Sequence, residues 1–188
     1  MTLLNNWEAT YFDFNEDKLV ALIGEAKHLG VDMFLLDDGW FANKYPRSSD
    51  HQGLGDWTET ADKLPNGIGK LTAEAKKQGV KFGIWIEPEM ANTTSELYEK
   101  HPEWVLKAPN REIVLGRGGT QVVLDLSNSE VQDFIFGIVD NLMTTYPEID
   151  YIKWDANMSI LNHGSQYLPS DQQSHMSVSY THLRAHET

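Results

Sequence analysis

The chain has 188 residues, of which 40% are hydrophobic and 23% charged, a composition typical of one globular domain with a sizeable core. Its 28 acidic and 15 basic residues give a net charge of −13, which argues against nucleic-acid and anionic-membrane partners and fits a neutral substrate. The absence of cysteine excludes disulfides and cysteine-bound metals, and no apolar run of about 18 residues predicts a membrane span. The opening residues lack the basic and apolar regions of a signal peptide, so we expect a cytoplasmic protein.

Short apolar runs alternate with amphipathic stretches, which predicts βα units around a parallel sheet. Residues 3–7 form a first predicted strand, and Asn15 can cap a helix that runs to residue 29 and stops at Gly30. A second strand, residues 31–36, precedes a polar loop that extends to about residue 65. The unit then repeats as a helix over residues 68–78, the stop Gly79, and a strand over residues 80–86.

The second half of the chain contains a predicted short helix at residues 95–100 and a short strand at 122–126, which belongs either to a side hairpin or to the main sheet. Ser127 and Glu130 fit a capping box for a long helix that ends at Tyr146-Pro147, and a strand follows at residues 149–154. We therefore predict an α/β fold, about four βα units forming the first half of a (β/α)8 TIM barrel over residues 1–175. Residues 176–188 do not continue the alternation of strands and helices and are predicted to be a foreign tail, disordered or artefactual.

Carboxylates follow three of the predicted strands, at the end where parallel sheets place their active sites. Asp37 and Asp38 come after the second strand, where a solvated turn is an equally good interpretation. Glu87 and Glu89 flank Pro88 after the third strand, a pattern that by itself is more typical of a loop than of a site.

Lys153-Trp154-Asp155 indicates an active site more specifically than the two acidic pairs do. Strand alternation places Lys153 and Asp155 on one face, so the ammonium is expected to lower the pKa of the Asp155 carboxyl and keep it ionised, as a glycosidase nucleophile must be. A surface ion pair worth less than about 1 kcal/mol is the alternative. Tryptophans in or beside the predicted strands are individually core residues, but together with the carboxylates they favour a carbohydrate pocket.

Two weaker patterns carry no predicted function. His182 and His186 have the spacing of a metal pair but lack a third ligand, and the Gly-rich stretch around Arg117 lacks the features of a phosphate loop. We predict neither a metal nor a cofactor. Arg117 could still reach a ligand hydroxyl from its loop.

Five ordered motifs in residues 3–175 resemble glycoside hydrolase family 36, the larger microbial α-galactosidases. They are Asp37-Asp38-Gly39-Trp40-Phe41, Gly55-Asp56-Trp57, Trp85-Ile86-Glu87-Pro88-Glu89-Met90, Leu124-Asp125-Leu126-Ser127 and Tyr151-Ile152-Lys153-Trp154-Asp155-Ala156-Asn157. The resemblance implies a (β/α)8 catalytic domain in a homo-oligomer. It also implies hydrolysis of terminal α-1,6-linked galactose, as in melibiose, raffinose and stachyose, with retention through a covalent galactosyl-enzyme intermediate.

The resemblance also implies roles for particular residues. Asp155 matches the nucleophile, and the pocket for a small galactoside would be completed by Asp37, Asp38, Trp85, Arg117, Lys153 and Asn157. The family's general acid/base, an Asp beyond a Cys-containing motif, has no counterpart in this chain, so we expect the chain alone to be inactive. A galactosyltransferase of the raffinose- or stachyose-synthase type and a non-catalytic sugar-binding fragment are the alternatives.

Overall fold

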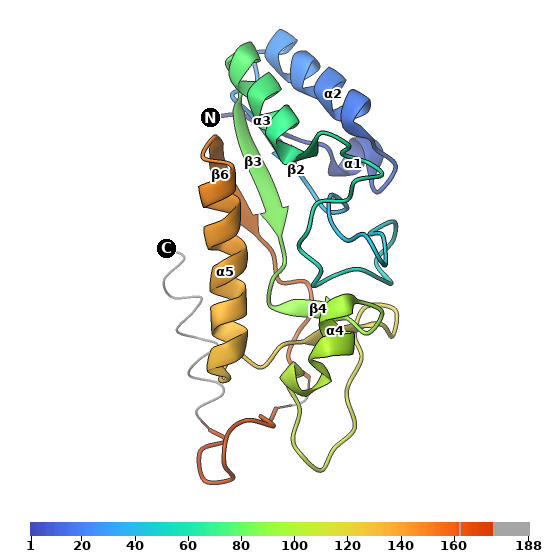
Figure 1. Ribbon diagram of the computed structural model, residues 1–188, viewed down its shortest axis with the longest axis vertical. Helices are drawn as coiled ribbons and strands as arrows, with labels where there is room; N and C mark the ends of the chain where they lie inside the picture. Colours follow the sequence, from blue (N-terminus) through green and yellow to red (C-terminus); the bar gives the residue numbers. More distant parts are fainter. Residues whose placement is uncertain (162, 175–188) are drawn as a thin grey trace.

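The computed structural model describes residues 1–161 and 163–174 and shows a parallel sheet with helices packed on it and a small antiparallel sheet at one end (Figure 1). The four parallel strands lie in the order β1 (Leu3–Asn5), β2 (Met33–Leu36), β3 (Lys81–Ile86) and β6 (Ile149–Trp154). Helices α2 (Glu16–His28), α3 (Gly67–Gln78) and α5 (Ser129–Thr145) precede β2, β3 and β6 respectively. The predicted βα alternation around a parallel sheet is therefore confirmed.

The helix boundaries follow from local signals in the sequence. Asn15 caps α2, because its side-chain oxygen accepts a hydrogen bond from the backbone N–H of Lys18 at 3.0 Å. Gly30 and Gly79 adopt the left-handed conformation just after α2 and α3, with φ of 73° and 69°. Short helices α1 (Trp7–Thr10), α4 (Glu96–Lys100) and η1 (Pro102–Trp104) lie in the connections.

The predicted capping box of the long helix is wrong in its first residue. Asn128, not Ser127, caps α5 by accepting the backbone N–H of Glu130 at 2.9 Å. Ser127 is unavailable because its hydroxyl donates to Asp125 and contacts the Ser165 hydroxyl. The Asp125 carboxylate, two residues earlier in the sequence, is the stronger acceptor and binds the serine hydroxyl in place of the helix end.

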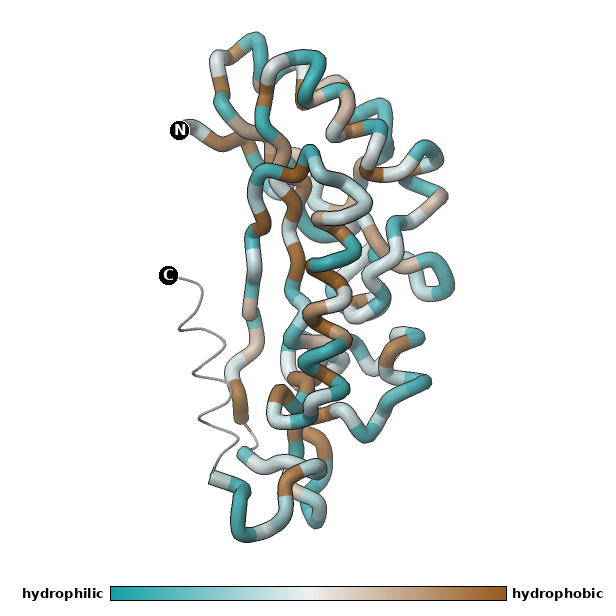
Figure 2. The backbone as a smooth tube through the Cα atoms, turned by 60° about the vertical axis from the view of Figure 1, so that its left-hand side comes forward, coloured by the Kyte–Doolittle hydropathy of each residue, from teal (hydrophilic) through white to brown (hydrophobic). Residues whose placement is uncertain are grey.

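The two faces of the parallel sheet differ in what covers them. Even-numbered strand residues, Phe34, Leu36, Phe82, Ile84 and Ile86, share one core cluster with residues of α2, α3 and α5. Apolar residues recur every three or four positions along these helices with polar residues between them, as Figure 2 shows for the long helix α5. Odd-numbered residues point to the opposite face, where Met33, Leu35 and Tyr151 crowd around Gly83.

The small sheet resolves the choice left open for the strand at residues 122–126. β5 (Gln121–Val123) pairs antiparallel with β4 (Met90–Asn92), so it belongs to a side hairpin and not to the main sheet. Figure 1 shows β4 just beyond the carboxyl end of β3, with α4 beside it. This insertion between β3 and β6 therefore adds residues to the edge where the parallel strands end.

The predicted tail, residues 176–188, lies outside the described residues, so the predicted boundary at residue 175 stays a prediction. Within the described part of the chain, none of the helices has the length and apolarity needed to cross a membrane.

Two glycines of the first βα unit allow a test of whether the left-handed conformation of Gly30 ends helix α2. A Cβ at either Gly24, inside α2, or Gly30, just after it, would meet no atom within 4 Å, so the two sites differ mainly in backbone conformation. We expect Gly24→Ala to raise the free energy of unfolding by about 1 kcal/mol and Gly30→Ala to lower it by about 1 kcal/mol. Urea denaturation of the protein and both variants measures this, and a stabilising Gly30→Ala would contradict the assigned stop.

Candidate active site

The polar residues predicted to form a site do gather at one edge of the sheet. Because all four strands are parallel, their carboxyl ends meet there, followed by Asn6, Asp37, Glu87 and Asp155 respectively. The register pairs Trp85 of β3 with Lys153 of β6, two residues before Asp155.

Asp155 lies half-buried among hydrogen-bond donors. Its Oδ2 accepts from the indole Nε1 of Trp85 at 2.9 Å, and its Oδ1 accepts from the backbone N–H of Ala156 at 3.0 Å. Its own backbone N–H donates to the carbonyl of Ile86 at 2.8 Å, which extends the β3–β6 ladder by one residue. Burial raises the pKa of this carboxyl, but the bonds from Trp85 and Asn157 outweigh burial and leave the pKa below its usual value. The carboxylate is ionised at neutral pH.

The predicted effect of Lys153 is confirmed in direction, but the hydrogen bond from Trp85 has the larger effect on the Asp155 pKa. The Lys153 ammonium donates to Asp37 Oδ2 at 2.9 Å, and its charge lowers the pKa of Asp155 less than the Trp85 bond does. Lys153 therefore pairs across the intervening strand β3 with the end of β2, and the indole of Trp85 is the stronger support for the charge on Asp155.

Trp85 is a buried donor rather than an open platform for a sugar ring. It is only 2% exposed, its ring lies parallel to that of Phe41 at a centroid distance of 6.2 Å, and Trp40 donates its indole N–H to the Trp85 carbonyl. Trp57 also packs on Phe41, with ring centroids 4.5 Å apart. This aromatic cluster fixes the indole so that its N–H points at Asp155.

The adjacent carboxylates Asp37 and Asp38 have different partners. Asp37 Oδ2 accepts from Asn5 at 2.6 Å as well as from Lys153. Asp38 forms a buried two-point ion pair, receiving the Nε and Nη2 of Arg47 at 2.9 and 2.8 Å. The prediction grouped the two aspartates as equal sugar ligands, but in this structure both oxygens of Asp38 hold Arg47 and so anchor the loop that follows β2.

Arg117 and Asn157 differ in how they connect to this arrangement. Arg117 is in a tight turn before β5 with φ of 42°, and its Nη2 lies 3.7 Å from Asp50 Oδ1, a carboxylate that Arg47 also contacts. Asn157 is in contact with the proposed nucleophile, because its side chain hydrogen-bonds both Asp155 and Glu87. The structure thus joins Asn157 directly to Asp155 and links Arg117 to Asp38 through a chain of ion pairs.

Three residues of the site were missed by the sequence analysis. Asn5 lay inside the predicted strand at residues 3–7, but β1 ends at Asn5, so a shorter strand would have placed it at the same edge as the carboxylates. Glu87 was set aside as a loop residue, yet it is fully buried and bonded to the turn after Asp155. Arg47 had no local signal, because only the folded loop brings it to Asp38.

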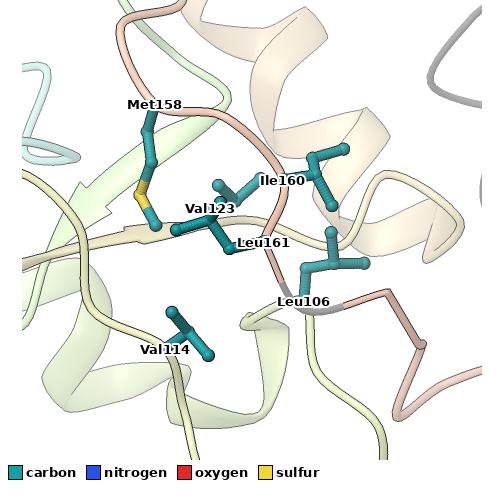
Figure 3. A pocket seen from close by; sticks show the side chains of 6 residues that line it. All are labelled: Leu106, Val114, Val123, Met158, Ile160 and Leu161. Atoms are coloured by element: carbon teal, nitrogen blue, oxygen red, sulfur yellow. The ribbon is translucent and has the colours of Figure 1, made fainter.

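A small apolar recess lies beside Met158, three residues after Asp155 in the sequence (Figure 3). It is lined by Leu106, Val114, Val123, Met158, Ile160 and Leu161. A Cβ at Gly116 would lie 2.7 Å from the Met158 sulfur, so Met158 packs directly on that glycine and ties the segment after Asp155 to the side hairpin. The described residues include no group of three or more His, Cys, Asp or Glu side chains that could hold a metal, and His182 and His186 lie outside them.

The chain belongs to the melibiase family, whose model matches residues 1–184 and so runs past the predicted boundary at residue 175. Among curated relatives, the chain is 46% identical over 171 residues to the α-galactosidase AgaA of Geobacillus stearothermophilus and 47% identical over 171 residues to the α-galactosidase Mel36A of Lactobacillus acidophilus. Each alignment covers 91% of this chain but only 23% and 22% of the relative. The chain thus spans less than a quarter of the length of these proteins.

Solved structures agree with this family. A family 36 α-galactosidase structure, AgaA of Geobacillus stearothermophilus in complex with raffinose, superposes with a TM-score of 0.88 at 43% identity, covering 95% of this chain and 24% of that one. The galactosidase domain of the α-galactosidase–sucrose kinase AgaSK gives a TM-score of 0.80 at 38% identity, covering 98% and 24%. The fold and family assigned from sequence motifs are confirmed at this level.

The support of Asp155 by the indole can be tested directly. Trp85→Phe removes the donor to Oδ2, so the pKa of Asp155 should rise, and by more than it does in Lys153→Met. Carboxyl-carbon NMR titration of protein labelled at aspartate measures both shifts. Trp104→Phe is the control, because the Trp104 indole faces Glu130 instead, and it should leave the Asp155 titration in place.

Proposed function

We propose that this chain is the first half of the (β/α)8 catalytic barrel of a retaining α-galactosidase that removes terminal α-1,6-linked galactose, with Asp155 as the nucleophile. The observation that carries the proposal is the ionised carboxylate of Asp155, held by the Trp85 indole at the edge where the parallel strands end. Family membership supports the reaction class. Complexes of AgaA with raffinose and stachyose support the substrate class.

In the proposed reaction an oxygen of Asp155 attacks the anomeric carbon of galactose. The glycosidic bond breaks, and the leaving oxygen takes a proton from a second carboxylic acid. A covalent galactosyl ester on Asp155 results, and water activated by the second carboxylate then hydrolyses it with net retention. The low pKa of Asp155 suits this role, because only the anion is a nucleophile.

Galactose recognition is proposed for the polar groups around that carboxylate. Asp37 and Lys153 form one ion pair that presents an acceptor and a donor to neighbouring hydroxyls. Asn157 lies in hydrogen-bond contact with Asp155 and can reach a hydroxyl near the anomeric carbon. Asp38 and Arg117 are proposed to bind galactose hydroxyls farther from the anomeric carbon, since Asp38 is already paired with Arg47 and Arg117 with Asp50.

The second carboxylic acid is proposed to come from a segment that this chain does not contain. Glu87 lies near Asp155 but is fully buried, and its two oxygens are bonded to Asn157 and Gln121, so it is not placed to protonate a leaving group. A cytoplasmic location, a homo-oligomeric whole enzyme and a foreign tail at residues 176–188 also stay predictions.

The missing acid predicts that the purified chain alone does not turn over. With nitrophenyl α-galactoside, nitrophenol release should not exceed about one equivalent per chain, because the carboxylate that activates water to hydrolyse the galactosyl ester is absent. A galactose titration by calorimetry distinguishes an inactive chain that still binds sugar from one that does not. Turnover near the rate of AgaA would disprove the assignment of the acid to another segment.

The nucleophile is tested in a complete enzyme that carries this chain, built by exchanging the matching segment of AgaA for it. Asp155→Ala should reduce hydrolysis by at least about 10⁴-fold, and added azide should restore part of it as the galactosyl azide of inverted configuration. Asp150→Asn is the matched control: Asp150 lies at the other end of β6, bonded to the Phe82 backbone, and its loss should leave kcat within about threefold. Asp155→Ala with most of the activity intact would rule out the proposed function.

A further inference from the structure

The end of β3 and the residues just after it hold the end of β6 and the turn that follows through a set of four hydrogen bonds. The Trp85 indole and the Ile86 carbonyl bind the side chain and backbone of Asp155. The other two bonds are made by carboxylates: Glu89 accepts from the Trp154 indole at 2.8 Å, and Glu87 accepts from the Asn157 backbone N–H at 2.5 Å. Asp155 is thus fixed from the residue before it to two residues after it.

Glu87 is the most enclosed member of this set. It has no exposed surface, and its second oxygen, Oε2, contacts the Nε2 of Gln121 on β5 at 3.3 Å. It therefore joins the end of β3, the Asp155 turn and the side hairpin at a single point. The side chain of Asn157 bonds both Glu87 and Asp155, so Asn157 links Glu87 to the proposed nucleophile.

We propose that Glu87 is a positioning residue for the galactosidase reaction, holding the Asp155 turn through Asn157 while itself uncharged. The inference rests on the proposed function, because it assigns Glu87 a part in setting the geometry of the proposed nucleophile. Glu87 acts on Asp155 through Asn157 and touches no reacting atom.

The charge balance around Glu87 favours its neutral form when Asp155 is an anion. Burial raises the pKa of Glu87 to about 7, the hydrogen bonds from Asn157 and the Arg117 charge oppose this rise, and the negative charge of Asp155 adds to it. A neutral Glu87 leaves Asp155 as the single anion of the turn, whereas two ionised carboxylates there would repel each other in a poorly solvated site.

The Gln121 side chain fits a protonated partner. It is buried, and in the orientation described its Oε1 has no hydrogen-bond partner while its Nε2 faces Glu87. Turning the amide by 180° places Oε1 against Glu87 Oε2, where it accepts the carboxylic acid proton and gains the missing bond. The carboxyl keeps its other oxygen for the Asn157 N–H.

The test compares three variants of the complete enzyme that carries this chain. Glu87→Gln preserves shape and neutrality, because its amide oxygen accepts from Asn157 and its amino group donates to Gln121, so kcat should stay within about threefold. Glu87→Ala frees the turn and should lower kcat by about 100-fold with KM changed less than about threefold. Glu59→Ala is the control for structural damage, since Glu59 accepts the backbone N–H of Ile68 in α3 and the hydroxyl of Tyr146 just after α5. It should lower the melting temperature without lowering kcat.

The pH dependence of kcat/KM tests whether Glu87 carries a charge, which measurements of stability do not. The acid limb of kcat/KM reports the ionisation of Asp155, and Glu87 is already protonated at that pH, so Glu87→Gln should leave the limb in place. A limb moved to lower pH would mean that a negative Glu87 had been raising the Asp155 pKa, and would overturn the inference. This comparison decides the matter even where Glu87→Ala does not accumulate as folded enzyme.

The remaining outcomes separate this inference from the function beneath it. If Glu87→Gln loses as much activity as Glu87→Ala, a charged carboxylate is required and the neutral positioning role is wrong. If Glu87→Ala keeps its kcat while Asp155→Ala is inactive, Glu87 has no positioning role and the proposed nucleophile still stands. Retained activity in Asp155→Ala would defeat both.

Discussion

The hydrogen bond from the Trp85 indole to Asp155 is the interaction on which the candidate site depends. It requires β3 and β6 to be neighbours in one register, and it requires the indole to be fixed by the aromatic cluster around Phe41. A donor held in this way stabilises the carboxylate anion without reorganising when charge moves during a reaction. The hydrophobic packing behind the sheet edge is therefore also what sets the electrostatics of the site.

The neighbouring aspartates show how one strand end can supply two functions. Asp37 faces along the row of strand ends and pairs with Lys153, whereas Asp38 turns into the following loop and pairs with the fully buried Arg47. Arg47 also bonds Asn92 of β4, so this ion pair ties the loop after β2 to the side hairpin. Burying this pair is costly, since desolvation raises the pKa of Asp38 despite the Arg47 guanidinium beside it, but the pair holds two irregular segments in place.

The strands, the long helices and the row of acidic residues could be predicted because each has a local cause. Apolar periodicity gives the elements, Asn15 and Gly30 mark the ends of α2, and parallel strands bring their carboxyl ends to one edge. The partners of those acids could not be read in the same way. Lys153 is two residues from Asp155 in sequence but bonds Asp37, and Asn128 displaced Ser127 as the α5 cap because Asp125 competes for the serine hydroxyl. Such choices depend on contacts between distant segments.

The ion pair that spans β3 has a consequence for how the chain reaches its native topology. Side chains alternate along a strand, so sliding β6 by a single residue would turn Lys153 and Asp155 toward the apolar layer of helices. Both charges would then be buried without partners. The charged groups of the candidate site thus also disfavour misaligned pairings of β6.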